Sequence, residues 1–143
     1  MSIDPLQLIS DKLATLMARK PVILASYVFG STVKGQTRPD SDVDVAVLLE
    51  SEAFKQLPLK YRANLTADVG AALGTFNADV ILLNDAPAAL AHNAITKGKL
   101  VFERSRSARV AFQVRNLNEF VDLEPIHRVH LQYLKRRYLK DPW

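Results

Sequence analysis

The chain has 143 residues, of which 48% are hydrophobic and 24% charged, which is enough for a single domain (1–143) with a buried core. The absence of cysteine excludes disulfides and thiolate metal sites, and the longest apolar run, residues 22–29, is too short to cross a bilayer. We therefore expect a soluble cytoplasmic protein, and its net charge of +4 favours an anionic partner such as a nucleotide, a nucleic acid or an acidic protein surface.

The first predicted element is a helix that starts near the N-terminus. Asp4 is placed to act as the N-cap, Pro5 occupies the first helical position, and Gln7 stands where the partner of a capping box would lie. An apolar stripe with helical spacing follows, made of Leu6, Ile9, Leu13 and Leu16. We expect this helix to pack on a sheet.

A central strand is predicted over residues 22–29, because the segment is apolar almost throughout and ends at a glycine. A short helical turn is expected over residues 31–34. Gly30 lets the backbone turn sharply and approach a ligand closely, and Ser31 offers a hydroxyl and an amide to a phosphate oxygen. The end of this strand therefore has the features of a phosphate site.

A second strand, over residues 42–49, carries two acidic side chains at its start. Because side chains alternate along a strand, Asp42 and Asp44 point to the same face, roughly 6.5 Å apart. The alternate positions are valines, which we expect to fill the core on the other face. Two carboxylates aimed together repel unless a cation lies between them, and hard oxygen ligands suit Mg²⁺, which shares its coordination with substrate phosphates.

A third acidic residue opens another strand further along the chain. A helix is expected from Pro58 to Gly74, with apolar residues at every fourth position and the glycine as its stop signal. Asp79 is the polar residue at the start of the apolar strand that follows, over residues 79–83. This strand is predicted to bring a third carboxylate into the same sheet.

The last part of the chain is predicted to add a helix over residues 87–96, an edge strand over residues 99–103 and a helical C-terminal segment over about residues 106–140. Pro125 either kinks this last segment or opens a second helix. An apolar stripe with helical spacing runs along it: Val110, Val114, Leu117 and Val121. The elements together predict an α/β (α+β) fold, in which helices flank a small mixed sheet of about four strands.

Each acidic residue has a simpler explanation when it is taken alone. Asp42 and Asp44 could belong to the solvated face of a strand, and Asp79 could cap a turn at a strand entry. The combination favours a metal site, because Gly30 and Ser31 precede the acidic pair at a fixed spacing and a third acid lies on another strand.

A glycine-serine pair, ten further residues and Asp-x-Asp form the motif of the nucleotidyltransferase superfamily related to DNA polymerase beta, which this chain resembles. The chain is most similar to the minimal nucleotidyltransferases, the MntA-like MNT antitoxins that pair with HepT-like HEPN toxins. Residues 78–83 and the Gly-Lys-Leu-Val-Phe-Glu segment at residues 98–103 also match that pattern. The resemblance covers roughly residues 20–105, and it implies a nucleotidyltransferase fold with this catalytic core.

The resemblance also implies roles for the motif residues. Asp42 and Asp44 would hold two Mg²⁺ ions, of which one bridges the triphosphate oxygens of ATP and the other coordinates the attacking hydroxyl. Asp79 would complete the coordination of the second ion and help to deprotonate the acceptor. Ser31 and the backbone of Gly30 would bind the β and γ phosphates.

Three polar residues of the intervening loop have two explanations each. Lys34 and Arg38 are either phosphate contacts, which offset the charge of the nucleotide, or solvated surface cations. Ser41 either binds phosphate or caps the strand that follows it. In the C-terminal segment, His127 and His130 are expected to be surface histidines, and the basic cluster at residues 135–137 belongs to a packing helix, a protein interface or a nucleic-acid interface.

The function implied by the resemblance is that of an antitoxin that transfers AMP from ATP to a tyrosine hydroxyl of a cognate HEPN ribonuclease toxin. A bulky anionic adduct at that position would block RNA entry, and nucleic acid is not expected as the direct substrate. Two alternatives stay open, a non-catalytic antitoxin that neutralises the toxin by binding and a small-molecule nucleotidyltransferase. The second is disfavoured because only about forty residues follow the last predicted strand, too few for an added acceptor-binding domain.

Overall fold

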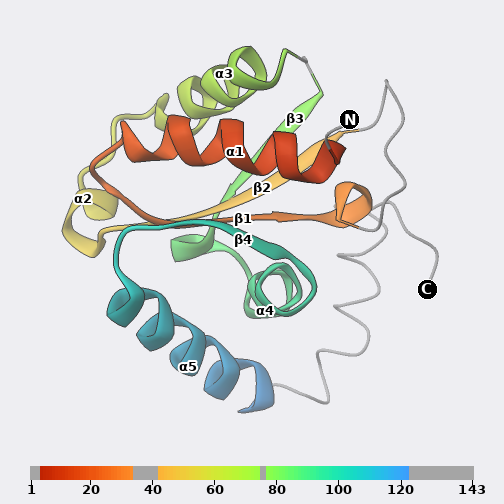
Figure 1. Ribbon diagram of the computed structural model, residues 1–143. Helices are drawn as coiled ribbons and strands as arrows, with labels where there is room; N and C mark the ends of the chain where they lie inside the picture. Colours follow the sequence, from red (N-terminus) through yellow and green to blue (C-terminus); the bar gives the residue numbers. More distant parts are fainter. Residues whose placement is uncertain (1–3, 34–41, 75–76, 123–143) are drawn as a thin grey trace.

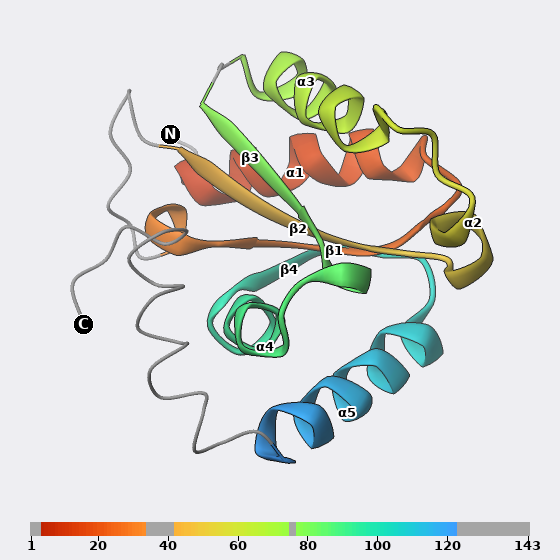
Figure 2. The same ribbon diagram turned by 180° about the vertical axis from the view of Figure 1, so that it is seen from behind.

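The computed structural model describes residues 4–33, 42–74 and 77–122, in which helices cover both faces of one four-stranded sheet (Figure 1). The strands are β1 (Ile23–Phe29), β2 (Val43–Leu49), β3 (Ala78–Leu82) and β4 (Lys99–Glu103). The helices are α1 (Pro5–Ala18), α2 (Ser51–Lys55), α3 (Tyr61–Leu73), α4 (Ala88–Lys97) and α5 (Arg106–Asp122), with short 3-10 turns η1 (Gly30–Thr32) and η2 (Leu83–Asp85). Helices α1 and α3 lie on one face of the sheet and α4 and α5 on the other, as the view from behind also shows (Figure 2).

The strand order is β3-β2-β1-β4, and it determines which strand ends meet. β1 runs antiparallel to both β2 and β4, whereas β2 and β3 run parallel to each other. The end of β1 therefore lies beside the starts of β2 and β3. The predicted mixed sheet of the α+β class is confirmed, with β4 at one edge and β3 at the other.

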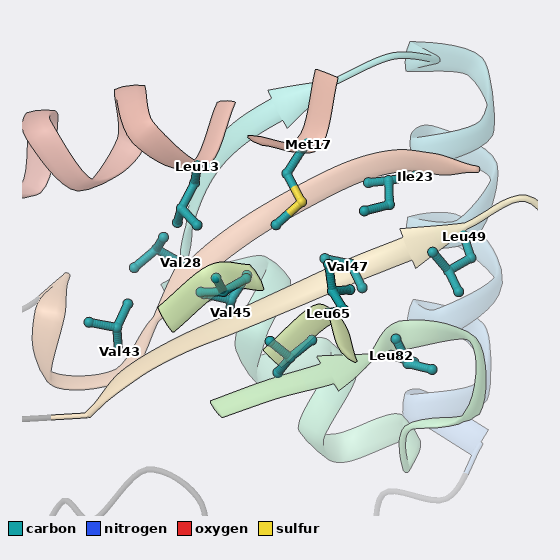
Figure 3. Packing of buried hydrophobic residues seen from close by; sticks show 12 residues of the cluster. Leu13, Met17, Ile23, Val28, Val43, Val45, Val47, Leu49, Leu65 and Leu82 are labelled. Carbon is teal, nitrogen blue, oxygen red and sulfur yellow. The ribbon is translucent and has the colours of Figure 1, made fainter. Parts of the chain in front are cut away.

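The sheet has an apolar layer on each face. In the layer under α1 and α3, Leu13 and Met17 of α1 and Leu65 of α3 pack on the alternate valines of β2 (Figure 3). The opposite layer combines Phe29 and the other side chains of the same strands with the apolar residues of α4. Both layers exclude water from the strands, and this burial is the main source of the stability of the fold.

The prediction that carboxylates line one face of β2 while the core fills the other holds only at the start of the strand. β2 is buried along its whole length. Beyond Asp44, the same face presents Ala46 and Leu48, which pack in the layer with α4. The sequence pattern could not show this covering helix, because strand alternation describes only the strand itself.

The first helix begins as predicted, but its second capping interaction does not form. Asp4 is the N-cap, and its Oδ1 accepts a hydrogen bond from the amide of Leu6 at 3.1 Å. Gln7 was expected to complete a capping box, but its amide donates to Asp11 Oδ1 at 2.8 Å, one helical turn further on. A local side-chain pair at i,i+4 has replaced the bond back to the N-cap.

The helix after β2 is divided differently from the prediction. α3 begins at Tyr61 instead of Pro58, because the Tyr61 amide donates to the Pro58 carbonyl in a turn that precedes the helix. Gly74 ends α3 as predicted, with a φ of +71° that favours glycine. The short helix α2 was not predicted, although Glu50 marks its start by accepting bonds from the amides of the second and third residues after it at 3.1 and 2.7 Å.

Helix α5 packs on the sheet with a different face from the apolar stripe that the sequence indicates. Phe112 and Phe120 pack against the layer that contains α4, and Asn116 donates to the Ala88 carbonyl at 3.1 Å. The stripe residues are exposed: Val110 by 41%, Val114 by 55%, Leu117 by 48% and Val121 by 57%. The predicted segment beyond residue 122, including Pro125, His127, His130 and the basic cluster, lies outside the described residues.

Within residues 4–33, 42–74 and 77–122, no helix combines the length and the apolar composition that a bilayer span requires.

Candidate active site

The candidate site lies where β1 ends and β2 and β3 begin. The strand register places Phe29 of β1 opposite Asp44 of β2, and Asp44 opposite Asp79 of β3. Gly30 follows Phe29 directly, so the glycine corner and two of the predicted carboxylates lie on three adjacent strands. Neighbouring strands are about 4.8 Å apart, which places the two aspartates side by side on the same face.

The Asp44 carboxylate lies against Gly30, where a side chain would otherwise be. The φ of Gly30 is +78°, and a Cβ atom at this position would lie 2.5 Å from Asp44 Oδ2. No real Cβ contact is that short, and an L-residue at this φ is strained. The glycine is thus required twice, once for the backbone turn and once because the carboxylate occupies the space of a side chain.

The two acids of the Asp-x-Asp pair differ in burial. Asp44 is only 7% exposed, whereas Asp42, immediately before β2, is half-buried. A buried carboxylate is costly unless it is paired, hydrogen-bonded or bound to a cation. The position of Asp44 next to a glycine corner therefore marks it as the central acid of the site.

Asp79, the third predicted acid, is in register with Asp44 and has a basic neighbour. Nη2 of Arg62 in α3 lies 3.7 Å from Asp79 Oδ1, and the Asp79 side chain is 44% exposed. Nε of Arg62 also donates to the Val80 carbonyl at 2.8 Å. Arg62 was not identified from the sequence, because it lies on a helix 17 residues before Asp79 and has no spacing signal that connects the two.

Turn η1 carries the predicted phosphate-binding residue Ser31, which is partly exposed beside Gly30. The next residue, Thr32, is only 2% exposed, and its buried Oγ1 has no hydrogen-bond partner in the described part of the chain. Thr32 was also missed by sequence reasoning, which considered only the glycine-serine pair. The turn thus places two hydroxyl side chains in sequence after the glycine corner.

The structure places Gly30, directly after β1, next to Asp44 of β2, which is in register with Asp79 of β3. Asp42 and Ser31 adjoin these residues in the chain. The three loop residues of the prediction lie outside the described residues: Lys34, Arg38 and Ser41.

The donor atoms of the site suit Mg²⁺ more than a transition metal. They are carboxylate oxygens, from Asp42, Asp44 and Asp79, and hard oxygen ligands favour Mg²⁺. In the described ranges, no three His, Cys, Asp or Glu side chains form a group that could hold a metal ion. Mg²⁺ does not need such a cage, because it is usually bound through one or two carboxylates together with water and substrate phosphates. The residues therefore fit a metal that arrives with a nucleotide.

Several solved structures share the fold, including the three that follow. A toxin–antitoxin structure with AMP-PNP is 23% identical with a TM-score of 0.70, and the match covers 87% of this chain and 97% of that chain. A structure of the toxin–antitoxin pair MntA–HepT is 22% identical with a TM-score of 0.66, over 90% and 97% of the two chains. A tri-AMPylated Shewanella oneidensis HEPN toxin in complex with MNT antitoxin gives 22% identity and a TM-score of 0.66, over 90% and 98%.

Sequence comparison identifies the family of the chain. No curated protein matches the sequence significantly. The family profile described as "Polymerase beta, Nucleotidyltransferase" matches residues 11–107, which is more than half of the chain and includes the glycine corner and all three acids. The chain therefore belongs to the polymerase beta nucleotidyltransferase family.

Proposed function

We propose that this protein is an ATP- and Mg²⁺-dependent antitoxin that transfers AMP to a tyrosine hydroxyl of a cognate HEPN toxin. The observation that carries the proposal is the contact position of Gly30 against Asp44, with Asp79 in register on the next strand. In a member of a nucleotidyltransferase family, this is the arrangement that a metal-dependent transfer site requires.

The reaction forms one bond and breaks one. The acceptor oxygen attacks the α-phosphorus of ATP, the bond from that phosphorus to the oxygen bridging to the β-phosphate breaks, and pyrophosphate leaves with the electron pair. The hydroxyl proton passes to a base, and the carboxylate of Asp79, whose side chain is 44% exposed, would take this role. Asp44, buried against the glycine corner, is positioned by the fold instead of by the substrate.

Two Mg²⁺ ions would be held by Asp42, Asp44 and Asp79. When bound, they would offset charge on the entering and leaving oxygens and on the phosphates. The chain supplies the oxygen ligands, the narrow glycine corner and the partly buried surroundings in which these charges act. The backbone of Gly30 and the hydroxyl of Ser31 would contact the β and γ phosphates.

The phosphate-binding part of the proposal extends to the loop between the two halves of the motif. Lys34 and Arg38 would add positive charge near the triphosphate, and Ser41 would add a hydroxyl just before the acidic pair. These three roles rest on the sequence motif. The anionic partner favoured by the net positive charge of the chain would then be the nucleotide itself.

The acceptor is proposed to be a folded protein, whose own structure would hold its hydroxyl in place for the attack. Similar folds occur in structures described as toxin–antitoxin complexes, one with AMP-PNP and one with a tri-AMPylated HEPN toxin. Those descriptions support a HEPN toxin as the acceptor and ATP as the donor. The pair would act in the cytoplasm.

The test is a transfer assay with the product of the adjacent gene. The full chain, Mg²⁺ and ATP labelled at the α-phosphate are incubated with that protein, and mass spectrometry locates the adduct. We expect AMP on a tyrosine, and no labelling with the Asp42→Asn, Asp44→Asn variant. Glu119→Gln, an exposed acid on α5, is the matched control and should label normally.

The same double variant separates catalysis from masking. If it still binds the neighbouring protein but no longer neutralises it in cells, neutralisation requires the transfer. Neutralisation by the double variant at wild-type expression would instead favour an antitoxin that acts by binding alone. Label that appears only on a small molecule would favour the small-molecule transferase.

A further inference from the structure

A basic side chain from the far face of the sheet reaches the third carboxylate of the site. Val80 packs in the layer under α3, so by strand alternation Asp79 points to the opposite face. Arg62 belongs to α3 but lies beside β3, the edge strand of the four-stranded sheet. The arginine therefore reaches Asp79 around the strand edge.

The guanidinium of Arg62 is held at that edge by the backbone. Nε donates to the Val80 carbonyl at 2.8 Å, and Nη2 lies 3.7 Å from Asp79 Oδ1. The bond to the main chain fixes the plane of the guanidinium, so that less side-chain freedom is lost when it pairs with a carboxylate. Arg62 is thus aligned with Asp79 before any ligand binds.

Three acidic side chains gather at this end of the sheet, where a basic neighbour reduces their mutual repulsion. Asp44 and Asp79 face each other in register on neighbouring strands, and Asp42 adds a third carboxylate nearby. Like charges directly opposite each other destabilise a sheet. Arg62 provides a positive charge next to one of these acids, since its guanidinium lies beside Asp79.

We propose that Arg62 is the resident counter-cation of Asp79, a positioning residue that holds this carboxylate in the metal-free protein and for which the divalent cation must compete. This inference rests on the proposed function to the extent that Asp79 is a metal ligand. Because the arginine and the metal compete for one carboxylate, binding linkage predicts the direction of change of both the stability of the metal-free protein and its metal affinity. Removal of the charge of Arg62 destabilises the metal-free protein and strengthens metal binding.

The size of the effect follows from exposure. The Arg62 side chain is 58% exposed and that of Asp79 is 44% exposed, so water and salt screen the pair. Exposed ion pairs of this kind change an equilibrium by a factor of about three to five. The change in metal affinity should shrink as the salt concentration rises.

The experiment measures metal binding without nucleotide or transfer. Mn²⁺, which can be followed by electron paramagnetic resonance, is titrated into the full chain, into Arg62→Gln and into Arg62→Lys. The Gln variant should bind Mn²⁺ about three to five times more tightly than the wild type and, without metal, unfold at a lower temperature. The Lys variant keeps the charge and should stay close to the wild type. Arg106→Gln, an exposed arginine at the start of α5, is the control and should change neither value.

The inference is overturned by any of the following outcomes. Equal or weaker Mn²⁺ binding by the Gln variant excludes competition, and a Lys variant that behaves like the Gln variant excludes a role of the charge. If the wild type and the Gln variant both bind no more Mn²⁺ than Asp42→Asn, Asp44→Asn, the carboxylates hold no cation in the nucleotide-free chain and the competition with Arg62 is excluded, whereas the proposed function is decided separately by the transfer assay. If the wild type binds Mn²⁺ specifically and Arg62 has no effect, only the role of Arg62 is wrong.

Discussion

The two ends of the β2–β3 pair use polar side chains in opposite ways. At the far end, the side chain of Asn84 links the segment after β3 to the end of β2. Its Oδ1 accepts a hydrogen bond from the Leu49 amide and its Nδ2 donates one to the Leu49 carbonyl, both at 2.9 Å. At the near end, Asp44 and Asp79 place like charges in register, with Gly30 against the first and Arg62 beside the second. One end joins the two strands through an amide, and the other end gathers carboxylates of the kind that a divalent cation binds.

The comparison shows how one pair of strands serves the fold at one end and function at the other. An amide that satisfies a buried backbone donor and acceptor stabilises the native state with no further partner. Carboxylates that face each other repel, and sites of this kind persist where function requires them. Substitutions at the two ends should therefore have opposite effects on stability and activity.

The largest effect is expected for Gly30→Ala at the functional end. The new Cβ would overlap Asp44 Oδ2, at 2.5 Å, so the carboxylate or the corner must move. A displacement of about 1 Å in a transfer site lowers the rate roughly a hundredfold. Labelled-ATP transfer measures this loss. Gly74→Ala is a matched control, because that glycine also has a positive φ but would place its Cβ in open space, and it should leave transfer unchanged.

The next effect belongs to the structural end. Asn84→Ala removes both bonds to Leu49 and leaves a buried amide and carbonyl without these partners. Unfolding in urea should show a loss of about 1 to 3 kcal/mol in the free energy of unfolding. At a temperature where the variant is folded, its transfer rate should equal that of the wild type. A lost rate without a lost stability would contradict the division between the two ends.

Asp44→Asn should show the reverse combination. An amide of nearly the same shape removes the charge that opposes Asp79, so we expect the free energy of unfolding to rise by about 0.5 to 1 kcal/mol without metal. Transfer should be lost, because an amide is a poor ligand for Mg²⁺ in place of a carboxylate. Urea unfolding in a metal chelator checks the sign, and a clear destabilisation would argue against repulsion at this site.

The smallest effect concerns the unpredicted helix α2. Hydrogen bonds from the amides of Ala53 and then Glu52 lower the pKa of the Glu50 carboxyl below its ordinary value. A lowered folded pKa adds stability that is present above the unfolded pKa and is lost as the pH falls through the folded pKa. Thermal unfolding of Glu50→Gln should thus show a slightly lower midpoint than the wild type at pH 7, and the difference should shrink at about pH 3. A constant difference would exclude the charge as its cause.

Much of the fold follows from local signals in the sequence. Asp4 with Pro5, the apolar segment ending at Gly30, and Gly74 each fix a boundary through short-range chemistry, and the structure places these boundaries as predicted. The start of α3 was wrong because a proline can also open a turn, as Pro58 does. The packed face of α5 was not predicted, because an apolar stripe in the sequence does not show whether other parts of the protein pack against it.

The candidate site also has a part that could be predicted from the sequence and a part that could not. The spacing of Gly30, Asp42 and Asp44 is a feature of one continuous segment, so the sequence alone could indicate it. The register of Asp79 against Asp44 and the reach of Arg62 around the sheet edge depend on the order of strands and helices. That order arises from tertiary packing, which no local pattern encodes.

The most direct test of the central claim is a thermal unfolding measurement with Mg²⁺ and AMP-PNP on the wild type and on Asp44→Asn. The carboxylates are proposed to hold a metal that binds together with the triphosphate, so the unfolding midpoint of the wild type should rise more with both ligands than with either alone. The variant should lose this joint effect. A wild type that gains nothing from the combination, or a variant that gains as much, would contradict the assignment of this strand end as a nucleotidyl transfer site.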